Sequence, residues 1–353
     1  MRKVLGILSS LALISGAAGM AAAADGESMS VGGTFYYDYF MNLTEGADEG
    51  TDATSGFEFR RVYLTVKKGW GDMSFRYTAD LDYNSGTGNL AVFSKYAYLE
   101  HRGLVPNASV LVGQHSPNTL AWVEKRWAYR SVAKTMSDEN KWSHSSQFGV
   151  GLQGKGMSGK LEYSLDVNNG NGYKSTVAKD GRGFSARVAG RPAGGFWVSG
   201  LASGDAPGGT FVDSPDTPAE TVVNLDSFDT YFEGFAGWEI DRGAAFVQVG
   251  RFRDAQWTGG GLNASAGLDE RTSLGISSFG RARLMDGLNA LGRVDRVDPN
   301  TDLDSDRFQF FVAGLDYRIH EGFFLQPNLQ VKTFEADGTK AERAFVLTCY
   351  GEI

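Results

Sequence analysis

Short stretches in which apolar and polar residues alternate recur along the whole chain, and each stretch ends at a turn. In the segment 161–167, Leu161 and Tyr163 fall on one face of an extended chain, and Glu162 and Asp166 fall on the other. Successive side chains of a β-strand point to opposite faces, so each stretch predicts a strand with one apolar and one polar face. A soluble β-sandwich and a membrane β-barrel both show this alternation. The location of the protein and the spacing of its turns must separate the two.

The start of the chain predicts export from the cytoplasm. Arg2 and Lys3 precede an apolar run, 4–14, and small residues ending in four alanines follow it. This is the layout of a secretory signal peptide. An uncleaved membrane anchor is the alternative, but the run is too short to span about 30 Å of hydrocarbon. We therefore expect residues 1–24 to be a signal peptide and residues 25–353 to form the mature protein.

The composition of the remaining chain limits its partners. Without Arg2 and Lys3, 32 basic residues face 42 acidic residues, so the net charge is near −10 and nucleic acid is not an expected partner. Cys349 is the only cysteine, so no intrachain disulfide is expected. The 47 glycines and 8 prolines suit a protein made of strands and tight turns.

Sixteen strands can be read from the alternation and from the clusters of Gly, Asn, Asp and Pro that interrupt it. Their approximate spans are 28–41, 56–68, 72–84, 90–101, 107–116, 146–154, 160–168, 182–191, 195–203, 226–240, 243–254, 270–283, 286–298, 305–319, 321–334 and 342–353. Short turns alternate with longer polar loops along the chain. The longer loops are 42–55, 84–89, 117–145, 169–181, 204–225, 255–269 and 335–341.

This alternation of connections places the tight turns at one end of the strands and the long loops at the other. Up-and-down barrels of outer membranes have this arrangement, whereas the crossing connections of a sandwich give no reason for it. Residues 25–353 provide roughly twenty residues for each strand and its connection, and a membrane strand needs about 9–11. The sequence therefore predicts an all-β protein, a transmembrane antiparallel up-and-down β-barrel of about 16 strands.

The third long loop, 117–145, differs from the others in composition. Residues 120–136 are rich in helix formers and aromatic residues, and Trp122, Trp127 and Trp142 would be costly to leave in solvent. A barrel of sixteen or more strands encloses an aqueous channel, so the loop can bury these rings by folding inward. We expect it to lie inside the barrel as a constriction loop and to carry a short helix near 120–136.

Three segments resemble the phosphate-selective porin O/P family. They are a glycine-rich strand, turn and loop at Gly149–Tyr173, the strand end and loop entry at Val110–Leu120, and a strand at Phe57–Trp70. The resemblance covers about a third of the chain. It implies a passive, usually trimeric, sixteen-stranded diffusion channel in the cell outer membrane of a Gram-negative bacterium, among lipid and lipopolysaccharide. It does not imply phosphate selectivity, since members of the family differ in solute.

The charged residues of the loop and of the polar strand faces are the candidate site. Loop 117–145 has a net charge near +2, and a positive constriction favours anions because the narrowest section sets the barrier. Alternatively, the loop cations pair with wall carboxylates such as Asp80 or Glu162 and hold the loop in place. The candidate constriction and pore-lining residues are Lys125, Arg126, Arg130, Glu124, Arg61, Arg76, Asp80 and Glu162.

These patterns predict an outer-membrane porin, a water-filled channel for passive diffusion of small polar or anionic solutes, as a homotrimer. No nucleophile, metal-protease or phosphate-loop motif occurs in the sequence, so we expect no enzyme, no cofactor and no metal site. The alternative function is that of a secreted or surface all-β binding or structural protein with a dry core. The two hypotheses differ in which face of the strands is buried.

Overall fold

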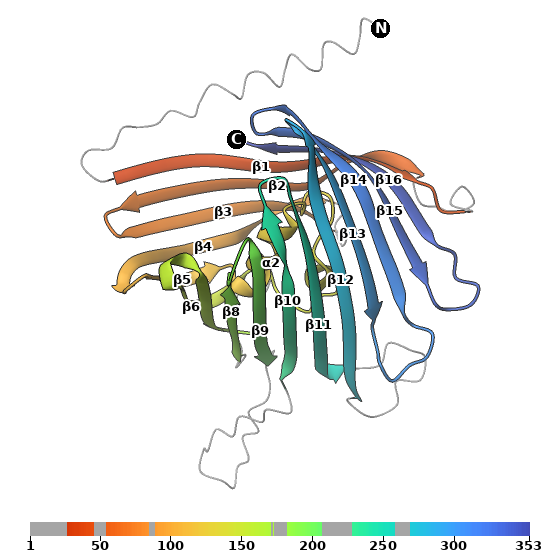
Figure 1. Cartoon of the computed structure of the whole chain (residues 1–353). Helices are drawn as coiled ribbons and strands as arrows, with labels where there is room; N and C mark the ends of the chain where they lie inside the picture. Colours follow the sequence, from red (N-terminus) through yellow and green to blue (C-terminus); the bar gives the residue numbers. More distant parts are fainter. Residues whose placement is uncertain are drawn as a thin grey trace, which may run out of the picture.

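Sixteen antiparallel strands close into a barrel in the computed structural model of the chain (Figure 1). The structure describes residues 27–45, 54–84, 89–170, 172, 182–206, 228–257 and 269–353. The predicted signal peptide, 1–24, lies outside the described residues, as does much of the predicted loops 42–55, 84–89, 169–181, 204–225 and 255–269.

The strands follow the alternating stretches of the sequence, each within about four residues of its predicted ends. They are β1 (Glu27–Asn42), β2 (Ser55–Trp70), β3 (Met73–Asn84), β4 (Asn89–Val105), β5 (Ala108–His115), β6 (Gln147–Gly156), β7 (Leu161–Asn168), β8 (Arg182–Gly190), β9 (Phe196–Ala206), β10 (Asp229–Ile240), β11 (Gly243–Trp257), β12 (Asp269–Met285), β13 (Leu288–Asp298), β14 (Phe308–His320), β15 (Phe323–Phe334) and β16 (Glu342–Glu352).

Each strand pairs with its two sequence neighbours, and β1 pairs with β16 to close the ring. The start of β1 and the end of β16 lie at the end of the barrel that carries the short turns, because Glu27 pairs with Trp70 and Thr34 with Glu352. The turn before β15 shows why these connections need glycine. Gly322 has φ +75°, and a Cβ there would lie 2.3 Å from the carbonyl oxygen of Glu352. The predicted up-and-down barrel is confirmed.

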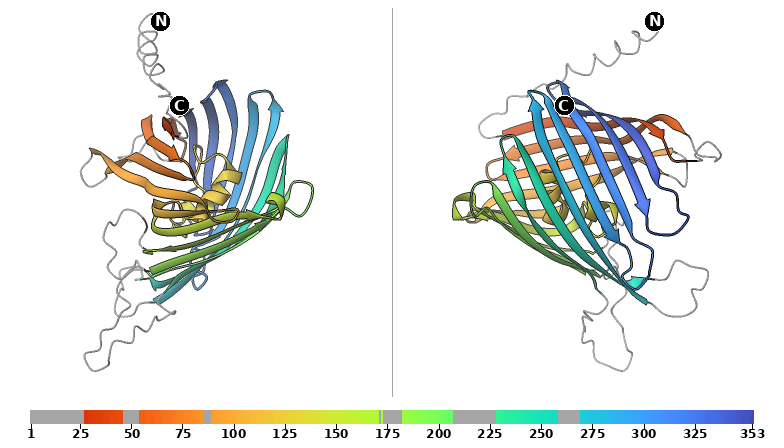
Figure 2. Two further views of the ribbon diagram at one scale, coloured as in Figure 1. Left: turned by 90° about the vertical axis from the view of Figure 1, so that its left-hand side faces the viewer. Right: turned by 45° about the vertical axis from the view of Figure 1, so that its right-hand side comes forward.

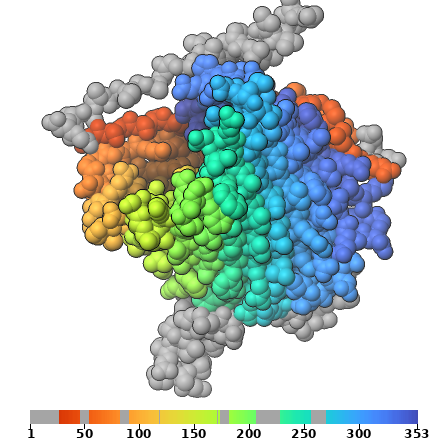
Figure 3. Space-filling model, viewed as in Figure 1, coloured from red at the N-terminus to blue at the C-terminus, as the bar shows by residue number. Residues whose placement is uncertain are grey.

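The apolar face of the strands points outward. Phe57 is 69% exposed, Leu165 is 53% exposed and Trp238 is 57% exposed, whereas the polar residues that alternate with such positions face the interior. The strands pack into a continuous outer wall (Figure 3). An apolar exterior around a charged interior does not favour the alternative of a soluble protein with a dry core. No helix in the described part of the chain is long and apolar enough to cross a membrane.

Six of the described strand pairs show a register shift, and two of these shifts, in β1–β2 and in β3–β4, bear on the lumen. Tyr36 pairs with Arg61 while Tyr37 pairs with Phe59, so Arg60 is an extra residue on β2. A second shift between β3 and β4 leaves Lys95 as the extra residue on β4. An extra residue places two consecutive side chains on one face of a strand. Each bulge therefore adds a cation to the interior that simple alternation assigns to the outside.

Two strand glycines provide a test of how closely the wall is packed. A Cβ at Gly237 would lie 2.2 Å from the Ala245 carbonyl oxygen, whereas a Cβ at Gly200 would have nothing within 4 Å. We expect Gly237→Ala to destabilise the barrel by about 1–3 kcal/mol through overpacking. Gly200→Ala should stabilise it by up to about 1 kcal/mol, because alanine loses less conformational entropy on folding. The temperature at which the detergent-solubilised barrel unfolds, followed by gel mobility, measures both. Equal effects of the two substitutions would contradict this packing.

The constriction loop and the lumen wall as candidate functional site

The third long loop lies inside the ring of strands (Figure 2). It carries α2 (Asn118–Trp127) and α3 (Met136–Glu139). The expected helix near 120–136 is shorter than predicted. It ends at Trp127 because Ala128 adopts a left-handed conformation, φ 63°, with its amide donating to the Glu124 carbonyl at 2.8 Å. This reversal turns the following residues back across the lumen.

Aromatic rings attach the loop to the inner wall formed by β8–β14. The ring of Trp122 lies 4.9 Å from that of Phe235, and the ring of Trp127 lies 5.5 Å from that of Phe279. Trp142 packs 5.9 Å from Tyr231 in a second cluster. Many inward-facing positions on these strands are aromatic or aliphatic where the loop covers them, and they form a hydrophobic cluster with the loop.

A buried ion pair lies beneath the loop on the same wall. Arg187 of β8 binds Glu233 of β10 at 2.8 Å, and their side chains are 2% and 0% exposed. Arg187 also donates to the Thr119 carbonyl, and Gln248 donates to Glu233 at 2.6 Å. Charges buried this deeply need full hydrogen bonding, which ties the start of α2 to the wall.

The tip of the loop reaches the opposite side of the lumen. Arg60 donates to the carbonyls of Ser131 and Val132, the latter at 3.1 Å. Gln330 of β15 also donates to the Val132 carbonyl, at 3.2 Å, and Ser131 donates to Gln326 at 2.7 Å. The loop therefore crosses the interior and is held on both walls. Arg60 is one of the bulge residues that alternation did not identify.

Arg126 and Glu162, both predicted site residues, come together. The Arg126 guanidinium lies 3.4 Å from the ring centroid of Trp122 and 4.4 Å from that of Trp197, and it binds Glu162 at 3.3 Å. Burial lowers the pKa of Arg126 to about 10, while Glu162 opposes this shift. The group therefore stays charged at neutral pH. This geometry matches the alternative in which a loop cation pairs with the wall.

Arg130 and Glu124 pair within the loop. Arg130 binds the carboxylates of both Glu124 and Asp138. Burial raises the pKa of Glu124, and the charge of Arg130 opposes this. Lys125 is exposed and lines a different cavity from Arg130. The three loop cations proposed from the sequence therefore do not form one cluster.

The predicted wall residues lie on neighbouring strands, β2 and β3. Arg61 binds Asp80 at 2.5 Å, with Asp80 fully buried, so this predicted carboxylate pairs with an arginine of the neighbouring wall strand. Arg76 lies over the ring of Tyr96, 4.7 Å from its centroid, and donates to the Thr78 hydroxyl at 3.1 Å. All three side chains face the interior.

Residues missed by the sequence analysis complete this wall. Arg60 binds Asp38 at 2.7 Å, and the bulge residue Lys95 donates to Ser145 at the end of the loop. The adjacent arginines Arg60 and Arg61 were the available signal, since two successive charges in a membrane strand require a bulge if both are to avoid lipid.

Two cavities open on opposite sides of the loop. The cavity toward the long loops has a volume of about 690 Å³ and is lined by Arg60, Arg61 and Arg130 among others. The cavity toward the short turns has a volume of about 1000 Å³ and contains Lys125 and Glu162. Residues of the loop line both cavities, so the loop lies between them.

Comparison with solved structures identifies the fold. The anion-selective porin of Comamonas acidovorans has a TM-score of 0.65 at 10% identity, over 93% of this chain and 100% of that chain. OmpT of Vibrio cholerae has a TM-score of 0.63 at 9% identity, over 94% and 99%. OmpF of Salmonella typhi, in complex with daunomycin, has a TM-score of 0.62 at 11% identity, over 93% and 98%. No family model and no curated protein sequence matches the chain. The fold is that of outer-membrane porins.

Trp127 provides a test of the loop attachment. Trp127→Ala removes a ring that is 1% exposed and a hydrogen bond to the Ala133 carbonyl at 2.8 Å, and loss of a core tryptophan costs about 3–5 kcal/mol. We expect the loop to detach and the single-channel conductance to rise, while the barrel remains folded. Trp238→Ala, which removes a ring from the outer face, should leave the conductance unchanged. Unaltered conductance in Trp127→Ala would show that the loop does not limit the pore.

Proposed function

We propose that this protein is an outer-membrane porin through which small polar solutes diffuse, with a preference for anions. A barrel that is apolar outside, charged inside and crossed by a loop supports a channel. Inward charges that keep exposed surface, such as those of Arg60 and Arg61, cost little only if that part of the interior is wet.

The solute path that we propose runs between the loop and strands β1–β4. Along β2, Arg61, Tyr63, Thr65 and Lys67 follow one another on the inner face beyond the bulge, and Lys67 pairs with Arg76 across the ladder. These residues extend from the cavity on the long-loop side toward the short turns. The opposite half of the interior is filled by the loop and the aromatic wall.

The anion preference rests on one observation, the orientation of the wall ion pairs. The side chains of Arg60 and Arg61 are 31% and 15% exposed, whereas those of their partners Asp38 and Asp80 are 3% and 0% exposed. The lumen therefore meets the positive end of each pair. Glu162 is more exposed than its partner Arg126, and the carboxylates of Glu124 and Asp138 are about as exposed as Arg130 between them. We therefore assign the two loop arginines to holding the loop and assign the selectivity to the wall.

We further propose that outer-membrane lipid and lipopolysaccharide are partners of the protein. Arginines on the outer face of the barrel support this proposal. Toward the long loops, Arg251 pairs with Phe232, Arg296 with Ile276, and Arg343 with Val331, so these arginines point outward at the end of the apolar band. Outward arginines at this end of the apolar band can bind the phosphate groups of lipids.

A homotrimer remains part of the proposal. One of the similar structures, OmpT of Vibrio cholerae, is described as a trimer form.

The porin family and the absence of catalysis are two further proposals. The resemblance of 149–173 to phosphate-selective porins suggests that family, although no family model matches. The protein is further proposed to act without catalysis. Among the described residues, no three His, Cys, Asp or Glu side chains gather as a metal site.

Replacing Arg61 tests the proposed selectivity. A unit charge about 5 Å from an ion in water contributes about 0.8 kcal/mol, and salt reduces this further. We expect Arg61→Gln to lower the anion-to-cation permeability ratio about twofold, measured as the reversal potential of bilayer channels in a KCl gradient. Lys125→Gln is the matched control and should change the ratio much less. A larger effect of Lys125→Gln than of Arg61→Gln would show that the loop, not the wall, determines the selectivity. The absence of any channel would refute the proposed function itself.

A further inference from the structure

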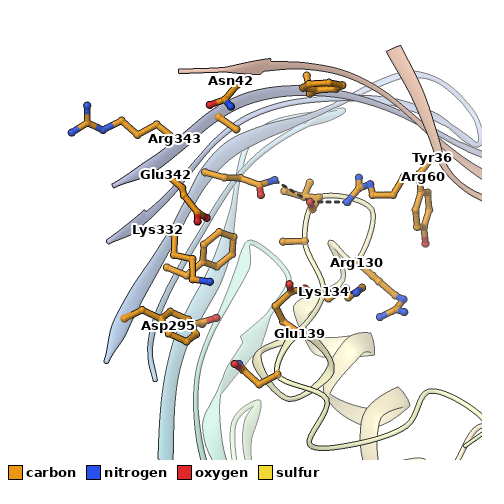
Figure 4. A pocket seen from close by; sticks show the side chains of 18 of the residues that line it. Tyr36, Asn42, Arg60, Arg130, Lys134, Glu139, Asp295, Lys332, Glu342 and Arg343 are labelled. Atoms are coloured by element: carbon orange, nitrogen blue, oxygen red, sulfur yellow. Dashed lines mark hydrogen bonds and ion pairs between the residues drawn. The ribbon is translucent and has the colours of Figure 1, made fainter. Parts of the chain in front are cut away.

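The cavity on the long-loop side combines cations with aromatic rings. It has a volume of about 690 Å³, within the range of about 300–1,000 Å³ typical of ligand sites. One wall is formed by Tyr36 and Phe40 of β1 with Arg60 and Arg61 of β2, and the other by β14 and β15. The tip of the loop forms the floor. Figure 4 shows Lys332, Lys134 and Arg130 placed around the same space.

Lys332 is a cation of this cavity that is available to a ligand. Among the described residues no carboxylate forms an ion pair with Lys332, although Glu342 lies opposite it in the β15–β16 register. The carboxylate of Asp295 is taken by Arg293, which donates to it at 2.8 Å. Lys134 and Glu139 form a loose pair, 3.8 Å apart, at the exposed surface of the loop. An anion in the cavity would therefore not compete with an existing partner of Lys332.

Aromatic rings surround the same ammonium group. The Nζ atom of Lys332 lies 4.4 Å from the ring centroid of Phe308 and 5.1 Å from that of Phe334. Phe308 and Phe310 are only partly buried and line the cavity, beside the apolar side chain of Val132. Half-buried rings in a wet vestibule leave apolar surface that a planar apolar group can cover.

From this geometry we infer that the cavity is a binding subsite for aromatic carboxylates, with the carboxylate on Lys332 and the ring against Phe308 and Phe310. This inference rests on the proposed function and names the solute class of the same channel. A small inorganic anion would use the cations but leave the rings in water. A neutral aromatic solute would leave the ammonium unpaired. An aromatic carboxylate pairs with the ammonium group and also covers the rings.

The experiment compares benzoate, acetate and inorganic phosphate as blockers of single channels in KCl. Benzoate should halve the conductance at a concentration at least tenfold lower than acetate or phosphate. Lys332→Gln should raise the half-blocking concentration of benzoate about tenfold, while Lys332→Arg should retain block. Lys125→Gln, in the cavity on the short-turn side, is the control and should leave block by benzoate unchanged. Phe308→Leu removes the ring and keeps the charge of Lys332, so it should weaken block by benzoate and leave block by acetate and phosphate unchanged.

Each other outcome has a defined meaning. Equal block by the three anions, or strongest block by phosphate, would overturn the subsite, as would benzoate block that survives Lys332→Gln. Calorimetric titration of benzoate into the detergent-solubilised protein gives a second readout that needs no channel. If the protein binds benzoate in this titration but conducts no ions, the proposed function fails and the subsite stands. If it conducts ions but shows no preference for benzoate, only the subsite fails.

Discussion

Closure of the β1–β16 seam is the constraint on which the rest of the structure depends. Beyond the paired strands, Gly33 and Ile353 exchange backbone hydrogen bonds of 2.8 and 2.9 Å, which extends the seam to the last residue. In hydrocarbon an open sheet edge would leave a row of unpaired amides and carbonyls, each costing several kcal/mol. A closed ring removes this cost. Closure of antiparallel neighbours also requires an even number of strands, and it places both ends of the ring on the short-turn side.

Closure creates an interior that is too wide for wall side chains alone to fill, and the loop divides it. On β8–β14, inward residues such as Phe235, Phe246 and Phe279 pack against the loop. On β1 and β2, inward residues such as Tyr36, Arg60 and Arg61 border the cavity on the long-loop side. The strands under the loop therefore turn many apolar side chains inward as well as outward, around buried polar pairs such as Arg187 and Glu233. This asymmetry is the reason that the proposed solute path runs along β1–β4.

Arginine has two different uses in this interior. Arg187 and Arg126 are almost completely buried and stacked or paired, so they act as structural ties. Arg60 and Arg61 keep part of their guanidinium surface exposed while their carboxylates lie behind them. A formal count of charges would treat the four alike. The field in the lumen depends on which end of each pair faces the water, since screening by solvent acts on exposed groups and much less on buried ones.

The strands, the barrel and the inward loop could be predicted from the sequence. The signals were alternation with period two, the ordering of turn lengths and the aromatic composition of residues 117–145, and each of these signals depends only on residues that are neighbours along the chain. Only the tertiary structure decided which charges are free. The pairing of Arg126 with Glu162, of Arg61 with Asp80 and of Arg187 with Glu233 joins residues 19 to 46 positions apart. The bulges at Arg60 and Lys95 were likewise not predicted; the adjacent Arg60 and Arg61 indicate the first, but the partner strand defines the position of a bulge. Local sequence sets the direction of a side chain within its own strand, but the neighbouring strands set its register and its partner.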